Sequence, residues 1–239
     1  MVGRYLEEQA KERSRNASNK DRKNLLAMFN WAAKRLDTRH NPAVMIDRLS
    51  HDRQPRYVPP EKDVLKVLAT TTREEQVLLD CYLYTGARRM EIFRLTWQDD
   101  VNLEKCQIRL GTRKTKDGSI SYEWLPMNKS LHDSLMWLYR NRKFPDSPFV
   151  FVCDQPGTRY GQPYTTRRKF MAGLCKRAGV RPFGFHALRD FVASILADKH
   201  KASTKTIQRV LRHKSVHTTE RYLQNMHTDL GGDDGTFGL

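Results

Sequence analysis

Two short stretches of alternating apolar and polar side chains interrupt a pattern that is otherwise helical, and they constrain the fold most. Residues 101–110 alternate with a period of two, residues 120–126 do so again, and Lys116-Asp117-Gly118 lies between them. Such alternation is typical of half-buried strands, and Asp-Gly is a strong signal for a tight turn between antiparallel strands. We therefore predict a β-hairpin or meander that forms a small sheet.

The long segments outside this sheet carry apolar residues at helical spacing. Pro60-Glu61 is a favourable helix start, because proline suits the first helical position and acidic residues suit the first turn. The other predicted helices cover residues 4–14, a segment from its cap Ser18 to Leu36, and 73–84, 88–95, 130–142, 165–177, 186–200, 203–212 and 217–224. The predicted fold class is mainly α with a small antiparallel β-sheet (α+β).

The stretch Asp47 to Pro60, DRLSHDRQPRYVPP, contains three prolines and almost no periodicity, which is typical of a linker. It separates two segments of unequal size. We predict a short, helical, basic domain with its linker over residues 1–56. A larger domain with a C-terminal tail follows over residues 57–239.

The chain is strongly basic, with 43 Lys and Arg against 27 Asp and Glu and a formal net charge of +16. The excess is present on both sides of the linker, whereas lipid binding favours one basic amphipathic helix or a terminal polybasic run. A protein that contacts a polyphosphate from two sides would have this charge distribution, and a merely well-solvated surface is the weaker alternative. The sequence contains neither a long apolar run nor a secretory signal, so we predict a cytoplasmic protein without a membrane span.

Several polar residues occupy positions that a plain helical core would not demand. An arginine follows a helix-breaking glycine, a histidine and an arginine lie three apart on one helix face, and a histidine precedes a tyrosine by nine residues. Each alone has an ordinary structural explanation, namely a surface arginine, a core histidine or a packed tyrosine. The residues concerned are Arg88, His186, Arg189, His213 and Tyr222.

Taken in order, these residues resemble the tyrosine recombinase (phage integrase) family. The matching elements are T-G-x-R-x-x-E at residues 85–91, a hairpin lysine, H-x-x-R at 186–189, a second histidine, and the tyrosine of T-T-E-R-Y. The resemblance covers about residues 60–224. It implies the catalytic-domain fold of that family, preceded here by a short helical segment similar to part of a core-binding domain.

The resemblance also implies a role for each matching residue. Tyr222 would be the nucleophile that forms a covalent 3′-phosphotyrosine link with DNA. Arg88 and Arg189 would bind the attacked phosphate, since guanidinium groups stay charged and donate two parallel hydrogen bonds. Glu91 would support the first arginine from behind.

Three further residues would handle protons or hold the phosphate. Lys116 would protonate the leaving 5′-oxygen as general acid, and Lys114 is the second choice for that role. His186 would accept the phenol proton or hold the phosphate, and His213 would donate a hydrogen bond to the phosphate. A polyanion would raise the pKa of both histidines.

The implied function is that of a site-specific DNA recombinase, or integrase, of a phage, a mobile element or chromosome maintenance. Its partners would be double-stranded DNA, three further copies of the chain in a synaptic tetramer, and accessory DNA-bending proteins at the nucleoid. The sequence contains no P-loop and no clustered carboxylates, so we expect no metal, ATP or other cofactor. The alternatives are nicking and resealing like a type IB topoisomerase, or DNA binding without catalysis on the same fold.

One residue departs from the family pattern. The family usually has glycine before the second histidine, giving L-G-H, whereas this chain has Leu211-Arg212-His213. If this position requires a positive φ, arginine costs about 1 kcal/mol or more relative to glycine. Alternatively, Arg212 adds a phosphate contact.

Overall fold

The computed structural model describes residues 1–36, 40–51, 56–113, 119–213, 215–217 and 219–220. The chain forms two compact units, Met1–Gln54 and Pro55–Leu239, and each is described by itself. Lys114, Lys116 and Tyr222 lie outside the described residues. Their predicted roles therefore stay predictions.

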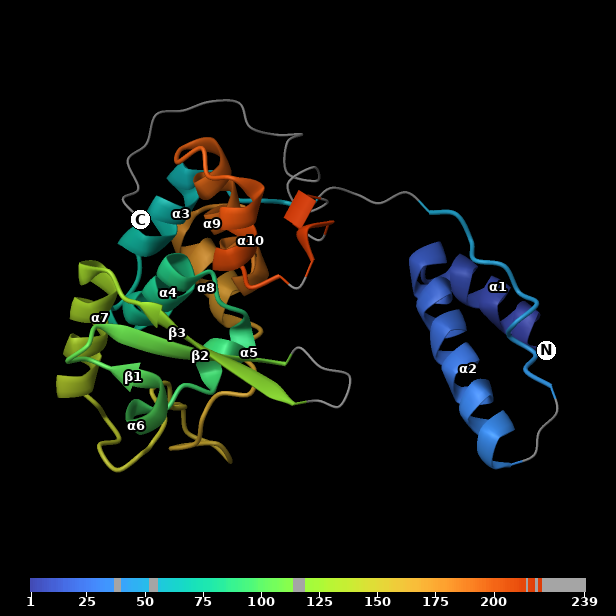
Figure 1. The fold of residues 1–239 in the computed structure, drawn as a ribbon, viewed down its shortest axis with the longest axis horizontal. Helices are drawn as coiled ribbons and strands as arrows, with labels where there is room; N and C mark the ends of the chain where they lie inside the picture. The colour runs from blue at the N-terminus through green and yellow to red at the C-terminus, as the bar shows by residue number, and fades with distance from the viewer. Residues whose placement is uncertain (37–39, 52–55, 114–118, 214, 218, 221–239) are drawn as a thin grey trace. The chain divides into compact units, whose positions relative to one another are not determined.

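The first unit is a pair of helices, α1 (Val2–Glu12) and α2 (Arg15–Arg35), which pack against each other (Figure 1). Ser14 caps α2, since its hydroxyl accepts the amide of the third helical residue at 3.1 Å. The prediction that Ser18 caps this helix is wrong. Ser18 lies inside the helix, where its buried hydroxyl donates to the carbonyl of Leu6 at 2.7 Å and fastens the two helices together.

The second unit contains the predicted sheet. Its strands are β1 (Val101–Asn102), β2 (Gln107–Arg113) and β3 (Ile120–Pro126), antiparallel in that order. The hairpin is confirmed, with Gln107 opposite Pro126 and Arg113 opposite Ile120. The single strand expected over residues 101–110 is wrong, because a turn that includes Cys106 at φ 50° divides it into β1 and β2.

Helices are the main secondary structure of the second unit, as predicted. In Figure 1 the strands lie below a group formed by α3, α4, α8, α9 and α10. The described helices of this unit are α3 (Glu61–Ala69), α4 (Arg73–Thr85), α5 (Arg89–Phe93), α6 (Trp97–Asp100), α7 (Lys129–Arg140), α8 (Phe170–Ala178), α9 (Phe185–Asp198) and α10 (Thr204–Val210). The predicted mainly α fold with a small antiparallel sheet is confirmed.

The core of the second unit is built around α4, which contacts both α7 and α9. Tyr82 of α4 is fully buried and stacks on Phe185, the first residue of α9, with ring centroids 4.6 Å apart. A capping box at Thr72 and Glu75 fixes the start of α4. Gly86 ends it at φ 56° in the left-handed region, which glycine adopts at little cost. The chain is thereby turned sharply just before Arg88.

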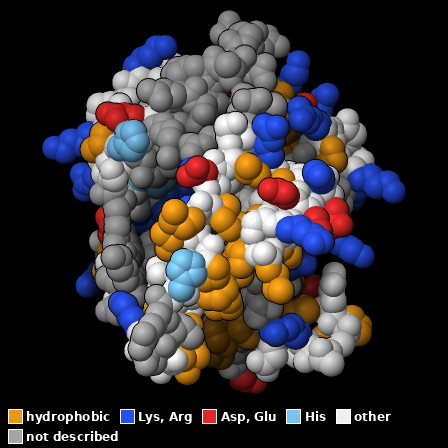
Figure 2. All heavy atoms as spheres, turned by 90° about the vertical axis from the view of Figure 1, so that its right-hand side faces the viewer, with side chains coloured by type: hydrophobic (Ala, Val, Ile, Leu, Met, Phe, Trp, Pro, Cys, Tyr) orange, Lys and Arg blue, Asp and Glu red, His pale blue; other side chains and the backbone are white. Residues whose placement is uncertain are grey.

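Charged side chains are spread over the surface. Figure 2 shows Lys and Arg side chains at many places on the face that it draws, with hydrophobic side chains between them. Among the described residues, no helix combines the length and apolar character that crossing a bilayer requires.

Candidate active site

Arg88 lies at the junction between α4 and α5, where it is the residue that precedes the first turn of α5. Its backbone amide donates to Glu91 Oε2 at 2.9 Å, and its guanidinium Nη1 donates to Glu91 Oε1 at 3.0 Å. The side chain of Arg88 is 41% exposed. Glu91 therefore holds the arginine from behind while its outer edge stays accessible.

Glu91 is a buried carboxylate that accepts hydrogen bonds from several segments of the chain. Besides Arg88, Thr112 of β2 donates its hydroxyl to Oε1 at 2.7 Å, and Arg212 donates Nη2 to Oε2 at 2.9 Å. Burial acts to raise the pKa of Glu91, but the Arg212 charge, the Arg88 amide and the Thr112 hydroxyl outweigh it and lower the pKa to about 2. The group is a carboxylate at neutral pH, as its predicted supporting role requires.

Arg189 of α9 is almost fully buried and connects two turns of the chain. Its guanidinium donates to the carbonyl of Gly86 on one side and to the carbonyl of Leu211 on the other. Burial, with the nearby charges of Arg88 and Arg212, lowers its pKa to about 9. Arg189 therefore still carries its charge near neutral pH.

His186 lies in the first turn of α9, one turn before Arg189. Its Nε2 contacts the guanidinium of Arg56 and lies 3.6 Å from Oδ1 of the buried Asp190. Partial burial, followed by the charges of Arg56, Arg189 and Arg88, lowers the pKa of His186 to about 4. Burial raises the pKa of Asp190 to about 6, against the opposing effect of the arginines.

His213 follows α10 and lies in the same electrostatic environment. Its Nδ1 is 3.0 Å from the hydroxyl oxygen of the buried Thr219, and its backbone amide donates to the carbonyl of Gln208 at 3.0 Å. Burial lowers its pKa to about 4, helped first by Arg189 and then by Arg88, His186 and Arg212. Mutual effects of this kind require that these groups lie close together.

The second unit thus brings together residues that the sequence separates by up to about 125 positions. We call the set formed by Arg88, Glu91, His186, Arg189, Arg212 and His213 the arginine–histidine cluster. Within it, Glu91 is the carboxylate on which two of the arginines converge. A cationic site with neutral histidines is suited to bind an anion such as phosphate.

Sequence reasoning missed three contributors to this site: Arg56, Thr112 and the structural role of Arg212. Thr112 lies on the buried face of β2. The alternation of side chains along this strand could have predicted that Thr112 points inward. Arg56 lies in the segment predicted as a linker. No periodicity in that segment could have predicted its contact with His186, which is 130 residues away. Arg212 has φ 51°, so the position does require a positive φ, and its guanidinium is buried against Glu91.

The family comparison covers the segment that contains this cluster. The sequence model of the phage integrase family matches residues 60–228, which is most of the chain. The chain belongs to the phage integrase (tyrosine recombinase) family. No curated protein sequence matches it.

Solved structures of phage integrase family proteins share the fold at low sequence identity. The Tn1549 transposon integrase in complex with circular intermediate DNA has a TM-score of 0.71 and 21% identity, over 92% of this chain and 79% of that one. A lambda integrase tetramer bound to a Holliday junction has a TM-score of 0.70 and 17% identity, over 98% and 66%. The XerH site-specific recombinase bound to palindromic difH has a TM-score of 0.67 and 18% identity, over 94% and 68%. The predicted catalytic-domain fold is thereby confirmed.

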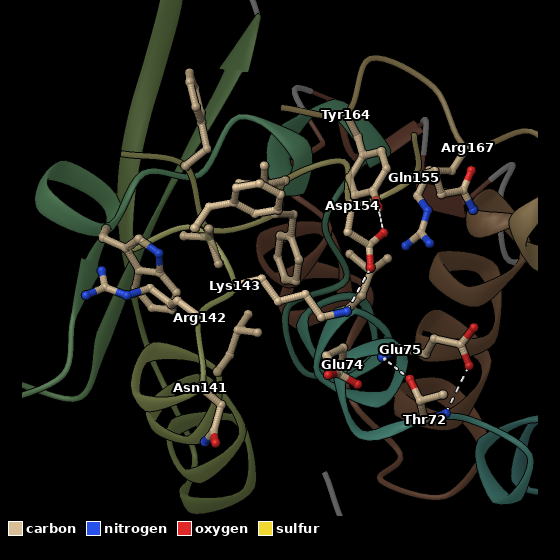
Figure 3. A pocket seen from close by; sticks show the side chains of 18 of the residues that line it. Thr72, Glu74, Glu75, Asn141, Arg142, Lys143, Asp154, Gln155, Tyr164 and Arg167 are labelled. Carbon is tan, nitrogen blue, oxygen red and sulfur yellow. Dashed lines mark hydrogen bonds and ion pairs between the residues drawn. The ribbon is translucent and has the colours of Figure 1, made fainter. Parts of the chain in front are cut away.

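A separate pocket of about 410 Å³ lies elsewhere in this integrase-family fold, beside α4 and α7 (Figure 3). Two of its charged groups, on Lys143 and Asp154, form an ion pair at 2.9 Å. None of the residues labelled in Figure 3 belongs to the arginine–histidine cluster. This pocket is therefore separate from the arginine–histidine cluster.

The low pKa values of the two histidines give a direct test of anion binding. We expect the imidazoles of His186 and His213 to titrate near pH 4 in the free protein. Bound sulfate would offset the arginine charges and raise both values towards 6.5. NMR titration of the two imidazoles with and without sulfate measures this shift, and unchanged values would argue against an anion site.

The same shifts predict how stability depends on pH. Because folding lowers these pKa values, the unfolded chain binds more protons than the folded chain between about pH 6.5 and pH 4. The contribution of the two histidines to folding therefore becomes less favourable as the pH falls through this window. Bound sulfate should reduce this loss of folding free energy, because it raises the pKa of both histidines in the folded state.

Proposed function

We propose that the protein is a site-specific DNA recombinase that cuts and rejoins DNA through a covalent 3′-phosphotyrosine intermediate. The observation that carries this proposal is the convergence of Arg88, Arg189, His186 and His213 in one cationic cluster within a phage integrase fold. Each side chain has the chemistry that its step requires.

In the cleavage step, the phenolic oxygen of Tyr222 attacks the phosphorus of a phosphodiester. The phosphorus–O5′ bond breaks, and the freed 5′-oxygen takes a proton from Lys116, with Lys114 as the second candidate. The phenol proton passes to His186, whose low pKa in the free protein leaves its imidazole unprotonated and able to accept it.

Arg88 and Arg189 stabilise the negative charge that gathers on the non-bridging oxygens, and His213 donates a further hydrogen bond. Fixed side-chain cations thus supply the electrostatic stabilisation. The phosphotyrosine conserves the energy of the broken bond, so a 5′-hydroxyl from another strand rejoins the DNA by the reverse reaction without ATP.

We propose double-stranded DNA as the substrate and a tetramer as the assembly that exchanges strands. The support is that lambda integrase has been solved as a tetramer on a Holliday junction and XerH on its palindromic difH substrate. The first unit, with two helices and a basic sequence, would act as a partial core-binding domain over residues 1–56, ahead of a catalytic domain over 57–239. The protein would work on intracellular DNA at the nucleoid, with DNA-bending proteins as accessory partners.

A strand-exchange assay distinguishes this function from its rivals. We expect the protein to exchange strands between two marked DNA duplexes that carry its recognition site. Relaxation of supercoiled plasmid without exchange would favour nicking and resealing of the type IB topoisomerase kind. Duplex binding without either reaction would favour a non-catalytic DNA-binding protein of the same fold.

A further inference from the structure

Arg212 combines a strained backbone with a buried charge. Its φ of 51° lies in the left-handed region, which arginine rarely adopts and where the family usually has glycine. Its side chain is only 1% exposed, and its Nε has no hydrogen-bond partner. Both features are unfavourable by themselves, so the interactions of the guanidinium must compensate for them.

The guanidinium of Arg212 binds one residue that precedes Arg88 in the sequence and one that follows it. Its Nη1 donates to the carbonyl of Thr85 at 3.1 Å, and its Nη2 donates to Glu91 Oε2 at 2.9 Å. Thr85 comes three residues before Arg88, and Glu91 comes three residues after it. Since His213 is the next residue, Arg212 fastens the turn that carries this histidine to the segment that carries the first arginine.

The charges of the cluster explain why an arginine is useful here. Glu91 faces Arg88 through Oε1 and Arg212 through Oε2, so Arg212 neutralises the carboxylate that would otherwise offset Arg88. With Arg212 in place, Arg88, Glu91, Arg189 and Arg212 sum to a formal charge of +2. With glycine at residue 212, the same group would sum to +1.

We propose that Arg212 is a positioning residue that locks Glu91 and Arg88 to the His213 turn and preserves a net charge of +2 for the phosphate. Its hydrogen bond to Glu91 Oε2 is the contact through which it acts on Arg88, which Glu91 holds through Oε1. The inference rests on the proposed function for its catalytic consequence. Its electrostatic consequence, tighter binding of a phosphate-like anion, does not depend on catalysis.

Four variants separate positioning and charge from a merely structural role. Arg212→Met removes the charge and keeps most of the length, whereas Arg212→Lys keeps the charge. Arg212→Met combined with Glu91→Gln restores the formal charge of +2 without leaving a buried carboxylate unpaired. Arg209→Met is the matched control, because Arg209 is an exposed residue of α10.

The first readout is the rate of covalent trapping on a nicked duplex at saturating DNA, measured beside the thermal unfolding midpoint. We expect Arg212→Met to lower the rate about tenfold or more, with duplex affinity unchanged within about twofold. Arg212→Lys should recover part of the loss, and the double variant should react faster than Arg212→Met. A double variant as slow as Arg212→Met, or a rate loss that follows the unfolding midpoint alone, would overturn the proposal.

The second readout is the affinity of the DNA-free protein for sulfate, followed through the His213 imidazole by NMR. Arg212→Met should weaken sulfate binding, the double variant should restore it, and Arg209→Met should match the wild type. Equal affinity in all four variants would overturn the proposed charge effect. If the wild type forms no covalent complex while sulfate affinity follows this order, the recombinase function fails and the role of Arg212 stands.

Discussion

Replacement of Tyr222 by phenylalanine is expected to abolish covalent trapping on a nicked suicide substrate while duplex binding persists. The substitution removes only the hydroxyl oxygen that would attack phosphorus, so the basic surface and the arginine–histidine cluster stay intact. On a nicked substrate the released fragment diffuses away, and the wild-type protein accumulates as a protein–DNA adduct that survives denaturation. Electrophoresis under denaturing conditions measures the adduct directly.

The matched control for this experiment is Tyr160→Phe. Tyr160 is 58% exposed, packs edge-on against Phe144 and does not belong to the arginine–histidine cluster. Its loss of a hydroxyl should leave trapping at the wild-type level. Trapping by Tyr222→Phe equal to that of the wild type would remove Tyr222 from the nucleophile role, whereas loss of trapping in both variants would point to a general defect.

Local sequence signals predicted the parts of the fold that depend on neighbouring residues. The Asp-Gly turn and the flanking alternation gave the β2–β3 hairpin, and Pro60-Glu61 gave the start of α3. The contact between Arg88 and Glu91, which the family resemblance implied, also lies within one helical turn. In each case the interacting groups lie close together in the chain, so short-range geometry is enough.

Contacts between distant segments were not predictable in the same way. Arg212 and Glu91 are 121 residues apart, and no periodicity relates one to the other. Ser14 and not Ser18 caps α2, and the reason lies in the packing of the two helices. The hydroxyl of Ser18 donates to the carbonyl of Leu6 on α1, whereas the hydroxyl of Ser14 accepts the amide of Ala17. A single residue with a positive φ, Cys106, was enough to divide one predicted strand in two.

Glu91→Gln is expected to destabilise the second unit by about 3 kcal/mol. The amide that replaces the carboxylate accepts weaker hydrogen bonds and leaves the buried Arg212 without a counter-charge. Urea denaturation followed by tryptophan fluorescence measures the loss, since three of the four tryptophans, Trp97, Trp124 and Trp137, belong to this unit. Glu104→Gln, at an exposed turn position, is the matched control and should stay within about 0.5 kcal/mol of the wild type.

The pH dependence of this difference tests whether the carboxylate charge is responsible. Folding lowers the pKa of Glu91 from 4.5 to about 2, so its ionised form stabilises the folded state above pH 4.5, and that contribution is lost as the pH falls towards 2. The gap between wild type and Glu91→Gln should therefore narrow as the pH is lowered through this window. A gap of constant size would assign the effect to packing, and it would also weaken the argument that Arg212 acts by neutralising Glu91.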